Sequence, residues 1–392
     1  MKKITEHLLL GLLLLHIGCS KSNDAQGTTP EKNQDPVQFV FTSDAHYGLK
    51  RAKFHGATNV DAHVVNADLV RQMNTLPSLT LPNDDGVNSG KKVDYVDYVL
   101  EGGDIANRME VSAKVQLGSI SWQQFEQDYI KGITLKNKKG ENAPLYLVPG
   151  NHDVSNTIGY YATMDPLTDP TSLVNIYNRM VAPAQLKTTT NFDYSKDRVN
   201  YSKEIGGVHF CFIQMWPDSS VRIWMEKDLA NVSATTPVAI VAHDQPGVVS
   251  NHFKNPNGKH DINNVDLFDN VLDEEFKDGT TAKVDATIEQ RAFASFLKKH
   301  PNIKLYLHGH VHKSQFETWT GPDNDVSLIS IGADSPMKGL ESAADETKLS
   351  FAFCTLDPKT MKITIRECMW DKTPDATENP IQWGESHSYS LK

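Results

Sequence analysis

The residues that could do chemistry in this chain are aspartates, histidines and one asparagine, and each follows a short apolar segment. In chain order they are Asp44, His46, Asp104, Asn151, His152, Asp153, His243, His310 and His312. Carboxylate, amide and imidazole groups without thiolates suit Mn²⁺, Fe or Zn²⁺ better than Ca²⁺ or a structural zinc. Two such ions about 3.5–4 Å apart can bind both an attacking hydroxide and phosphoryl oxygens. The residue types therefore favour Lewis-acid hydrolysis in which water is the nucleophile.

Five short, β-branched and aromatic segments precede these polar residues, which predicts buried strands that end at the site. The segments are Val37–Thr42, Tyr95–Leu100, Leu145–Val148, Val238–Ala242 and Ile303–Leu307. Helical patterns lie between them, at Asp61–Met73, Ser119–Ile133, Ser219–Leu229 and Ala286–Lys299. Alternating strands and helices predict a layered α/β core. Sites in such folds lie beyond the carboxyl ends of the strands, so we expect the polar residues to converge there.

Four more strands are expected later in the chain, at Val208–Met215, Asp325–Ile331, Leu349–Leu356 and Met361–Ile365. Two polar, Gly- and Asn-containing stretches have the composition of insertions, Pro77–Lys92 and Gln245–Asp285. The second follows His243 directly, so we expect residues 245–285 to border the site.

The order and spacing of the polar residues resemble a known family. Asp44-x-His46, Gly103-Asp104, Gly150-Asn151-His152-Asp153, an isolated His243 and Gly309-His310-x-His312 are similar to the five motifs of the calcineurin-like metallophosphoesterases. Any single Asp or His could be a hydrogen-bonded residue at a strand end, but all five motifs occur in the family's order. The resemblance implies an α/β/β/α sandwich with mixed central sheets, forming a single catalytic domain over residues 37–392.

The resemblance also implies a role for each motif residue. Asp44, His46 and His312 would hold one divalent metal ion, Asn151, His243 and His310 the other, and Asp104 would bridge the two. His152 would stay off the metals, stabilising the transition state or protonating the leaving oxygen, and Asp153 would orient its imidazole. The cofactors expected are two divalent ions, Mn, Fe or Zn.

A pair of residues in the loop that follows the bridging aspartate could contact the substrate. Asn107 and Arg108 could reach a substrate phosphate, because a guanidinium matches two phosphoryl oxygens. Purple acid phosphatases carry a tyrosine ligand at the position of Asn107, so their iron–tyrosinate chemistry is not expected. We expect a phosphodiesterase or a broad phosphatase acting on small phosphoesters, with a phosphomonoesterase or nucleotidase as the alternative. A surface lipoprotein that uses the same fold only to bind a ligand is the alternative of another class.

Composition limits the other possibilities. The chain has 392 residues, of which 39% are hydrophobic and 22% charged, as in a folded globular protein. Its formal charge of -10 argues against non-specific nucleic-acid binding, which requires clustered cations to displace counterions. The four cysteines lack CxxC pairing, which argues against a zinc knuckle or a redox dithiol.

The N-terminus predicts export. Lys2 and Lys3 precede the apolar run Leu8–Leu15, which is the length of a signal-peptide core and too short to span a bilayer. The following His16-Ile17-Gly18-Cys19-Ser20 resembles the lipobox of bacterial lipoproteins, although His16 departs from the usual leucine. We expect residues 1–19 to be a lipoprotein-type signal segment, Cys19 to carry a lipid anchor, and residues 20–36 to be a flexible polar tether in the cell envelope.

Overall fold

The computed structural model describes residues 35–107, 116–154, 169–193, 196–248, 287–374, 376 and 378–392. Residues 34–392 form one compact unit. The predicted signal segment and tether up to residue 34, Arg108 and residues 249–285 of the predicted insertion lie outside the described residues. None of the helices in the described part of the chain has the length and apolar character of a membrane span.

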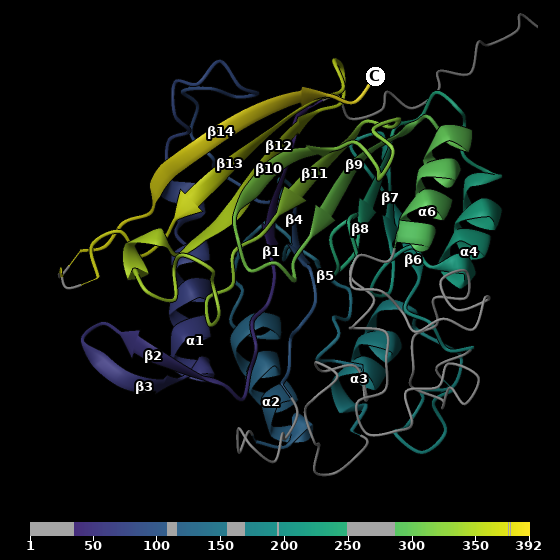
Figure 1. The fold of residues 1–392 in the computed structure, drawn as a ribbon. Coiled ribbons are helices and arrows are strands. Elements are labelled where there is room, and N and C mark those ends of the chain that lie inside the picture. Colours follow the sequence, from purple (N-terminus) through teal and green to yellow (C-terminus); the bar gives the residue numbers. More distant parts are fainter. Residues whose placement is uncertain are drawn as a thin grey trace, which may run out of the picture. The chain divides into compact units, whose positions relative to one another are not determined.

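Two six-stranded sheets form the centre of this unit (Figure 1). The first has the order β14-β13-β12-β1-β4-β5 and the second β10-β11-β9-β8-β7-β6. The strands of the first sheet are β1 (Val37–Thr42), β4 (Tyr98–Glu101), β5 (Leu145–Leu147), β12 (Ser350–Asp357), β13 (Lys362–Met369) and β14 (Gln382–Ser390). Those of the second are β6 (Tyr201–Ile205), β7 (Val208–Phe212), β8 (Val238–Val241), β9 (Ile303–His308), β10 (Gln315–Trp319) and β11 (Leu328–Gly332). A small hairpin of β2 (Lys50–Phe54) and β3 (Ala57–Asp61) lies apart from both sheets.

Both sheets are mixed, as expected. β1 pairs parallel with β4 and antiparallel with β12, and its six residues are all buried. In the second sheet β7, β8, β9 and β11 run parallel, while the edge strands β6 and β10 are antiparallel to their neighbours. Strands that are buried on both faces need apolar residues at every position, which explains the continuous apolar runs in the sequence.

The two sheets pack face to face through aromatic side chains. Phe39 of β1 meets Phe210 of β7 edge to face, with ring centroids 5.8 Å apart. Tyr146 of β5 contacts Phe212 at 5.4 Å between centroids, and Phe212 stacks on Tyr201 at 4.7 Å. Interdigitating rings of this kind form the core between two sheets.

Helices complete the α/β/β/α layering (Figure 1). On the first sheet's side lie α1 (Ala62–Met73), α2 (Gly118–Phe125), which continues as a π-helical segment (Glu126–Ile130), and α3 (Thr171–Met180). On the second sheet's side lie α4 (Ser219–Leu229) and α6 (Thr287–Lys299). α4 begins where expected because the Asp218 carboxylate caps it, accepting a hydrogen bond from the Val221 amide at 2.8 Å. Two short 3₁₀ turns, Leu76–Ser78 and Glu346–Lys348, complete the elements in the described residues.

Two strands, β4 and β11, start three residues later than the sequence indicates, and β11 begins at Leu328 instead of Asp325. Tyr95–Asp97 were expected in the second strand, but β4 begins at Tyr98. The Gln38 side chain donates to the carbonyls of Val93 and Tyr95 at 2.9 and 3.0 Å, and the Asp97 carboxylate accepts from the Gln38 amide. These residues are therefore bound to β1 by side-chain hydrogen bonds and by one backbone bond, from the Asp97 amide to the Gln38 carbonyl at 2.6 Å, rather than by a regular strand ladder.

The predicted insertion Pro77–Lys92 is fixed to the first sheet by an ion pair with a buried arginine. Arg366 of β13 is fully buried and donates to both carboxylate oxygens of Asp84, at 2.7 and 3.0 Å. The same guanidinium also donates to the Val87 carbonyl and to Thr355. All of these acceptors together compensate the burial of the guanidinium, so this stretch is an integral part of the fold.

Candidate metal centre

The predicted site residues come from the carboxyl ends of five parallel strands. The pairing of β1 with β4 continues beyond the strands, because the Asp44 and His46 amides donate to the Gly103 and Asp104 carbonyls at 2.9 Å. In the second sheet the Gly309 amide donates to the His243 carbonyl at 3.0 Å. These backbone bonds fix the loops that carry the side chains, and the expected convergence is confirmed.

Close packing at these loops requires glycine at two positions. A Cβ at Gly150 would lie 2.2 Å from Asp104 Oδ1, and one at Gly309 would lie 1.9 Å from Ser43 Oγ. Five of the site residues also have left-handed backbone conformations, with φ between 46° and 67°: Asp44, His46, Asp104, His310 and His312. Such conformations cost about 1–3 kcal/mol each outside glycine and concentrate at functional sites.

Two groups of potential ligand atoms share Asp104. The first is Asp44, His46, Asp104 and His312, and the second is Asp104, His243 and His310; within each group the ligand atoms lie within 4.8 Å of one another. Asn151 belongs with the second group, since its Oδ1 is 3.1 Å from both His243 Nε2 and His310 Nδ1. The structure thus gathers all seven predicted ligands into two adjoining groups.

Distances around Asp104 show how the two groups meet. Its Oδ2 lies 3.3 Å from His243 Nε2 and 3.8 Å from His46 Nε2, while its Oδ1 accepts from the His152 amide at 2.7 Å. One carboxylate oxygen therefore faces both groups, and the other is held by the backbone of the Gly-Asn-His-Asp loop.

Acceptors behind the imidazoles determine their tautomers. His243 Nδ1 lies 2.9 Å from the Gly102 carbonyl, which can only accept, so Nδ1 carries the proton and Nε2 presents a lone pair to the site. His46 Nδ1 lies 2.7 Å from Asn107 Oδ1, which has the same effect on that ring. Each of the two lone pairs then faces another imidazole nitrogen at 3.2 Å, in His310 and His312 respectively. This geometry suits a shared cation.

The pKa values of His46 and His243 are shifted in opposite directions. Burial, and next the charge of Lys338, lower the pKa of His46 to about 3, so that imidazole is neutral. Burial alone would also lower the pKa of His243, but the Asp104 and Asp44 carboxylates raise it well above its usual value. The Nε2 atom of His243 therefore lies where positive charge is favoured, and a cation bound there would replace the second proton of the ring and meet its lone pair.

Asn107 contacts one of the predicted metal ligands, and its contact with a substrate phosphate stays a prediction. It is buried, and its side-chain oxygen contacts His46 Nδ1. Through this contact Asn107 orients the imidazole of His46, a role that the sequence analysis did not predict. Asp244, directly after His243, has a comparable role, since its Oδ1 lies 3.3 Å from His310 Nε2.

The prediction that Asp153 orients His152 is wrong. Both Asp153 oxygens accept backbone hydrogen bonds instead, Oδ2 from Ile105 and Gly150 at 3.1 and 2.9 Å, and Oδ1 from Ala106 at 3.0 Å. Burial, and next the Asp104 charge, raise the pKa of Asp153 to about 6, while these three donors oppose the rise. Asp153 therefore joins the loop that carries Asp104 to the loop that carries Asn151.

Lys338 is a site residue that the sequence analysis missed. Its Nζ lies 3.4 Å from His152 Nε2. Ser335 fixes the turn that carries it, donating to the Asp44 carbonyl at 2.8 Å and accepting from the Lys338 amide at 3.0 Å. The available signal was its position a few residues after β11, a strand parallel to β9, whose carboxyl end reaches the same edge of the sheet.

Comparisons with known proteins agree with this geometry. Residues 37–314 match the model of the calcineurin-like phosphoesterase family, and the chain belongs to that family. A comparison with curated protein sequences gave no match. Family membership supports hydrolysis of phosphoesters, and the α/β/β/α fold expected from the motifs is confirmed.

Solved structures similar to this chain share little sequence with it. A conserved uncharacterized protein of Streptococcus pneumoniae TIGR4, a predicted phosphoesterase, is 10% identical over 91% of this chain and 98% of that chain, with a TM-score of 0.32. A putative 5'-nucleotidase of Staphylococcus aureus is 11% identical over 91% of this chain and 54% of that chain, with a TM-score of 0.35. The calcineurin-like phosphoesterase YfkN of Bacillus subtilis is 11% identical over 91% of each chain, with a TM-score of 0.30.

Replacement of Asp153 by alanine should destabilise the fold. It would leave three buried amides without their acceptor, and each such loss costs about 1–3 kcal/mol. We expect the free energy of unfolding in urea to fall by about 3 kcal/mol or more, whereas His152→Ala, which leaves these three amides with their acceptor, should change it by less than about 1 kcal/mol. Equal stability of the Asp153 variant and the wild type would contradict the assigned role.

Proposed function

We propose that this chain is a dinuclear metal-dependent phosphoesterase that hydrolyses phosphodiesters, or a broad range of small phosphoesters, outside the cytoplasm. The observation that carries the proposal is the buried Asp104 carboxylate shared by two groups of ligand atoms. A phosphomonoesterase or nucleotidase remains the alternative specificity, because the site geometry applies equally to both ester types.

The residues present fit two divalent ions. Asp44 Oδ1 is buried and lies 3.1 Å from His312 Nε2, and the lone pairs of His46 and His243 face into the site. In this assignment Asp44, His46 and His312 hold one ion, Asn151, His243 and His310 hold the other, and Asp104 serves both. Mn, Fe and Zn all suit such a mixture of oxygen and imidazole donors. When bound, the ions supply Lewis acidity toward phosphoryl oxygens and lower the pKa of water.

Two side chains of the chain itself complete the chemistry. His152 Nε2 lies 3.9 Å from Asp104 Oδ2 and 3.4 Å from Lys338 Nζ, so both side chains lie next to the shared carboxylate. An anionic phosphoryl group placed there would accept from both. In our proposal His152 protonates the leaving oxygen, and Lys338 holds a non-bridging phosphoryl oxygen.

Activity and metal content should respond differently to two substitutions. With added Mn²⁺ we expect turnover of at least one ester in a panel of mono- and diesters. Asp104→Asn should lose both bound metal and activity, since it removes the shared charge. His152→Ala should keep its metal while kcat falls by about 10²–10⁴-fold, the usual contribution of a general acid.

Metal analysis by mass spectrometry, paired with steady-state kinetics on the same preparations, checks both effects. Activity retained in both variants would contradict the mechanism. Absence of turnover for every ester in the wild type would instead favour the non-catalytic, ligand-binding alternative.

Lys338 should affect substrate binding more than metal binding. Lys338→Met should raise KM about tenfold, because one charge-assisted hydrogen bond to phosphate contributes about 1.5–3 kcal/mol. Lys338→Arg should restore most of the affinity, and Lys359→Met, at an exposed turn remote from the site, serves as the control. Steady-state kinetics with unchanged KM in Lys338→Met would rule out the assigned contact.

Export and anchoring form a separate part of the proposal. They rest on the apolar run Leu8–Leu15 and the lipobox-like residues before Cys19, which lie outside the described residues. We expect a labelled fatty acid to be incorporated when the full chain is expressed in a bacterium, and Cys19→Ser to abolish the label. Incorporation that persists in Cys19→Ser would place the modification elsewhere.

A further inference from the structure

Another group of potential metal ligands lies on the outer face of the second sheet and shares no residue with the candidate metal centre. His209 and Cys211 are two positions apart on β7, so their side chains lie on the same face of the strand. Phe210, between them, faces the first sheet, where it packs against Phe39. His209 and Cys211 therefore point to the side of the second sheet that α4 covers (Figure 1).

Asp228, in the last turn of α4, completes the group. Its Oδ2 lies 2.7 Å from His209 Nε2 and 3.6 Å from Cys211 Sγ. All three ligand atoms lie within 4.8 Å of one another. The side chain of Asp228 is 20% exposed, and β6, the neighbour of β7, is the edge strand of the sheet. An ion can therefore reach the group from solvent, although Cys211 itself is buried.

Side chains of β6 hold two of these ligands from behind. Glu204 lies directly opposite His209, and Ser202 opposite Cys211, in the antiparallel pairing of the two strands. The Glu204 carboxylate contacts His209 Nδ1, and the Ser202 hydroxyl donates to Asp228 Oδ1 at 2.9 Å. The remaining ring nitrogen and the remaining carboxylate oxygen are thereby turned toward the ligand group. Metal ligands in proteins are commonly oriented by such partners on their far atoms.

The donor set of one thiol, one imidazole and one carboxylate suits Zn²⁺, whereas Ca²⁺ and Mg²⁺ are bound by oxygen atoms. Bonds of about 2.0–2.3 Å to zinc place neighbouring tetrahedral ligands about 3.3–3.7 Å apart. Asp228 Oδ2 and Cys211 Sγ already have this spacing, at 3.6 Å. Asp228 Oδ2 and His209 Nε2 are closer, at 2.7 Å, because they share a proton that an ion would replace.

Protons occupy the group when no ion is bound. Burial, and next the Asp228 charge, raise the pKa of Cys211 well above its usual value, so its sulfur is a thiol. Burial alone would lower the pKa of His209, but its hydrogen bonds to Asp228 and Glu204 raise it, so positive charge is favoured at this ring. Bound zinc would release the thiol proton and one ring proton, and zinc affinity should therefore rise with pH.

We propose that His209 Nε2, Cys211 Sγ and Asp228 Oδ2 bind a zinc ion that joins β7 to α4. Three protein ligands leave the fourth tetrahedral position to water. The site goes beyond the proposed hydrolysis and does not depend on it. Its occupancy can be read from a metal–thiolate bond, which the candidate metal centre cannot form because its ligands include no cysteine.

Titration of the full chain with Co²⁺, followed by absorption spectroscopy, tests the proposal. A thiolate bound to cobalt gives a sulfur-to-metal charge-transfer band in the near ultraviolet. We expect a saturable band in the wild type and also in Asp104→Asn, whose metal centre lacks its shared charge. Excess Zn²⁺ should displace the cobalt and remove the band, because zinc has a filled d shell.

Two results would overturn the zinc site whatever the activity of the chain toward phosphoesters. The first is a wild type that shows no charge-transfer band at any cobalt concentration. The second is a band that excess Zn²⁺ does not remove.

Two variants locate the ion, each with a matched control. Cys211→Ala should abolish the band, whereas Cys354→Ala, which removes a buried thiol of the first sheet, should keep it. Asp228→Asn should weaken cobalt binding at least about tenfold, whereas Asp323→Asn, at an exposed turn, should bind as the wild type does. Asp228 is partly exposed, so its variant tests the group even if Cys211→Ala fails to fold. A band retained in Cys211→Ala, or wild-type affinity in Asp228→Asn, would overturn the assignment.

Discussion

The burial of the Asp104 carboxylate among imidazoles is the constraint on which the rest of the site depends. Asp104 is 1% exposed, and a carboxylate in such an environment is costly unless positive charge and hydrogen-bond donors surround it. Here the His152 amide holds one oxygen, and His243 and His46 face the other. Two sheets must deliver these groups, so the fold and the site are specified together.

The loops around Asp104 adopt strained backbone conformations, and the surrounding structure compensates for them. Left-handed φ values at Asp44, Asp104 and His312 are maintained by hydrogen bonds between loops of different strands. Asp153 contributes most directly, because its carboxylate accepts from three amides of two loops. A rigid frame of this kind holds the ligand atoms in place before any ion binds, which reduces the cost of ordering them.

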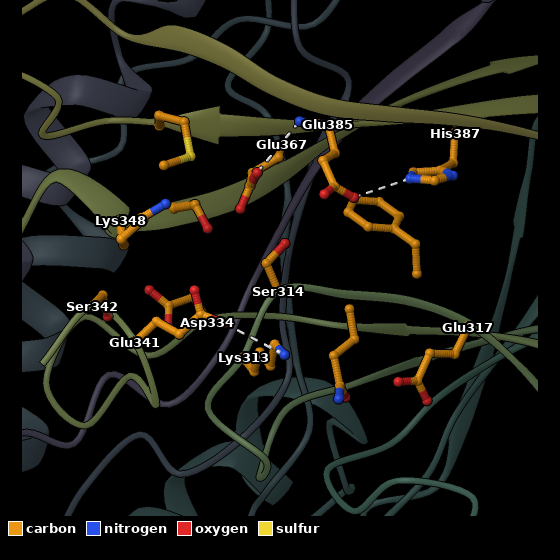
Figure 2. A pocket seen from close by; sticks show the side chains of 14 residues that line it. Lys313, Ser314, Glu317, Asp334, Glu341, Ser342, Lys348, Glu367, Glu385 and His387 are labelled. Carbon is orange, nitrogen blue, oxygen red and sulfur yellow. Dashed lines mark hydrogen bonds and ion pairs between the residues drawn. The ribbon is translucent and has the colours of Figure 1, made fainter. Parts of the chain in front are cut away.

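The last part of the chain contributes to the site as well. The family match ends at residue 314, whereas Ser335 and Lys338 lie beyond it and reach Asp44 and His152. The same stretch after β11 also contributes Asp334 and Glu341 to the lining of a separate pocket between β10 and β13 (Figure 2). The stretch after β11 therefore contacts the candidate metal centre and also lines the separate pocket. Residues outside the family motifs thus form part of the surroundings of the metal centre.

The sequence determined which residues take part and in what order they occur. The strand Val37–Thr42 is buried at every position and mostly apolar, and the helix Ser219–Leu229 has a capping aspartate at its start, so both have the expected bounds. The sequence analysis did not predict the helix Thr171–Met180 or the strand Gln382–Ser390. The strand is largely exposed and lacks a regular apolar alternation, so its pattern gives no strand signal. Their structure depends on neighbours far away in the chain.

Only the tertiary structure decided what each polar side chain contacts. Asp153 is adjacent to His152 in sequence yet binds backbone amides about fifty residues away, and Asn107 contacts His46, which lies 61 positions before it. A hydrogen-bond partner depends on the direction of a side chain and on which distant loops pack beside it. Residue type and spacing fix the possible chemistry, whereas the packing of two sheets selects the partners.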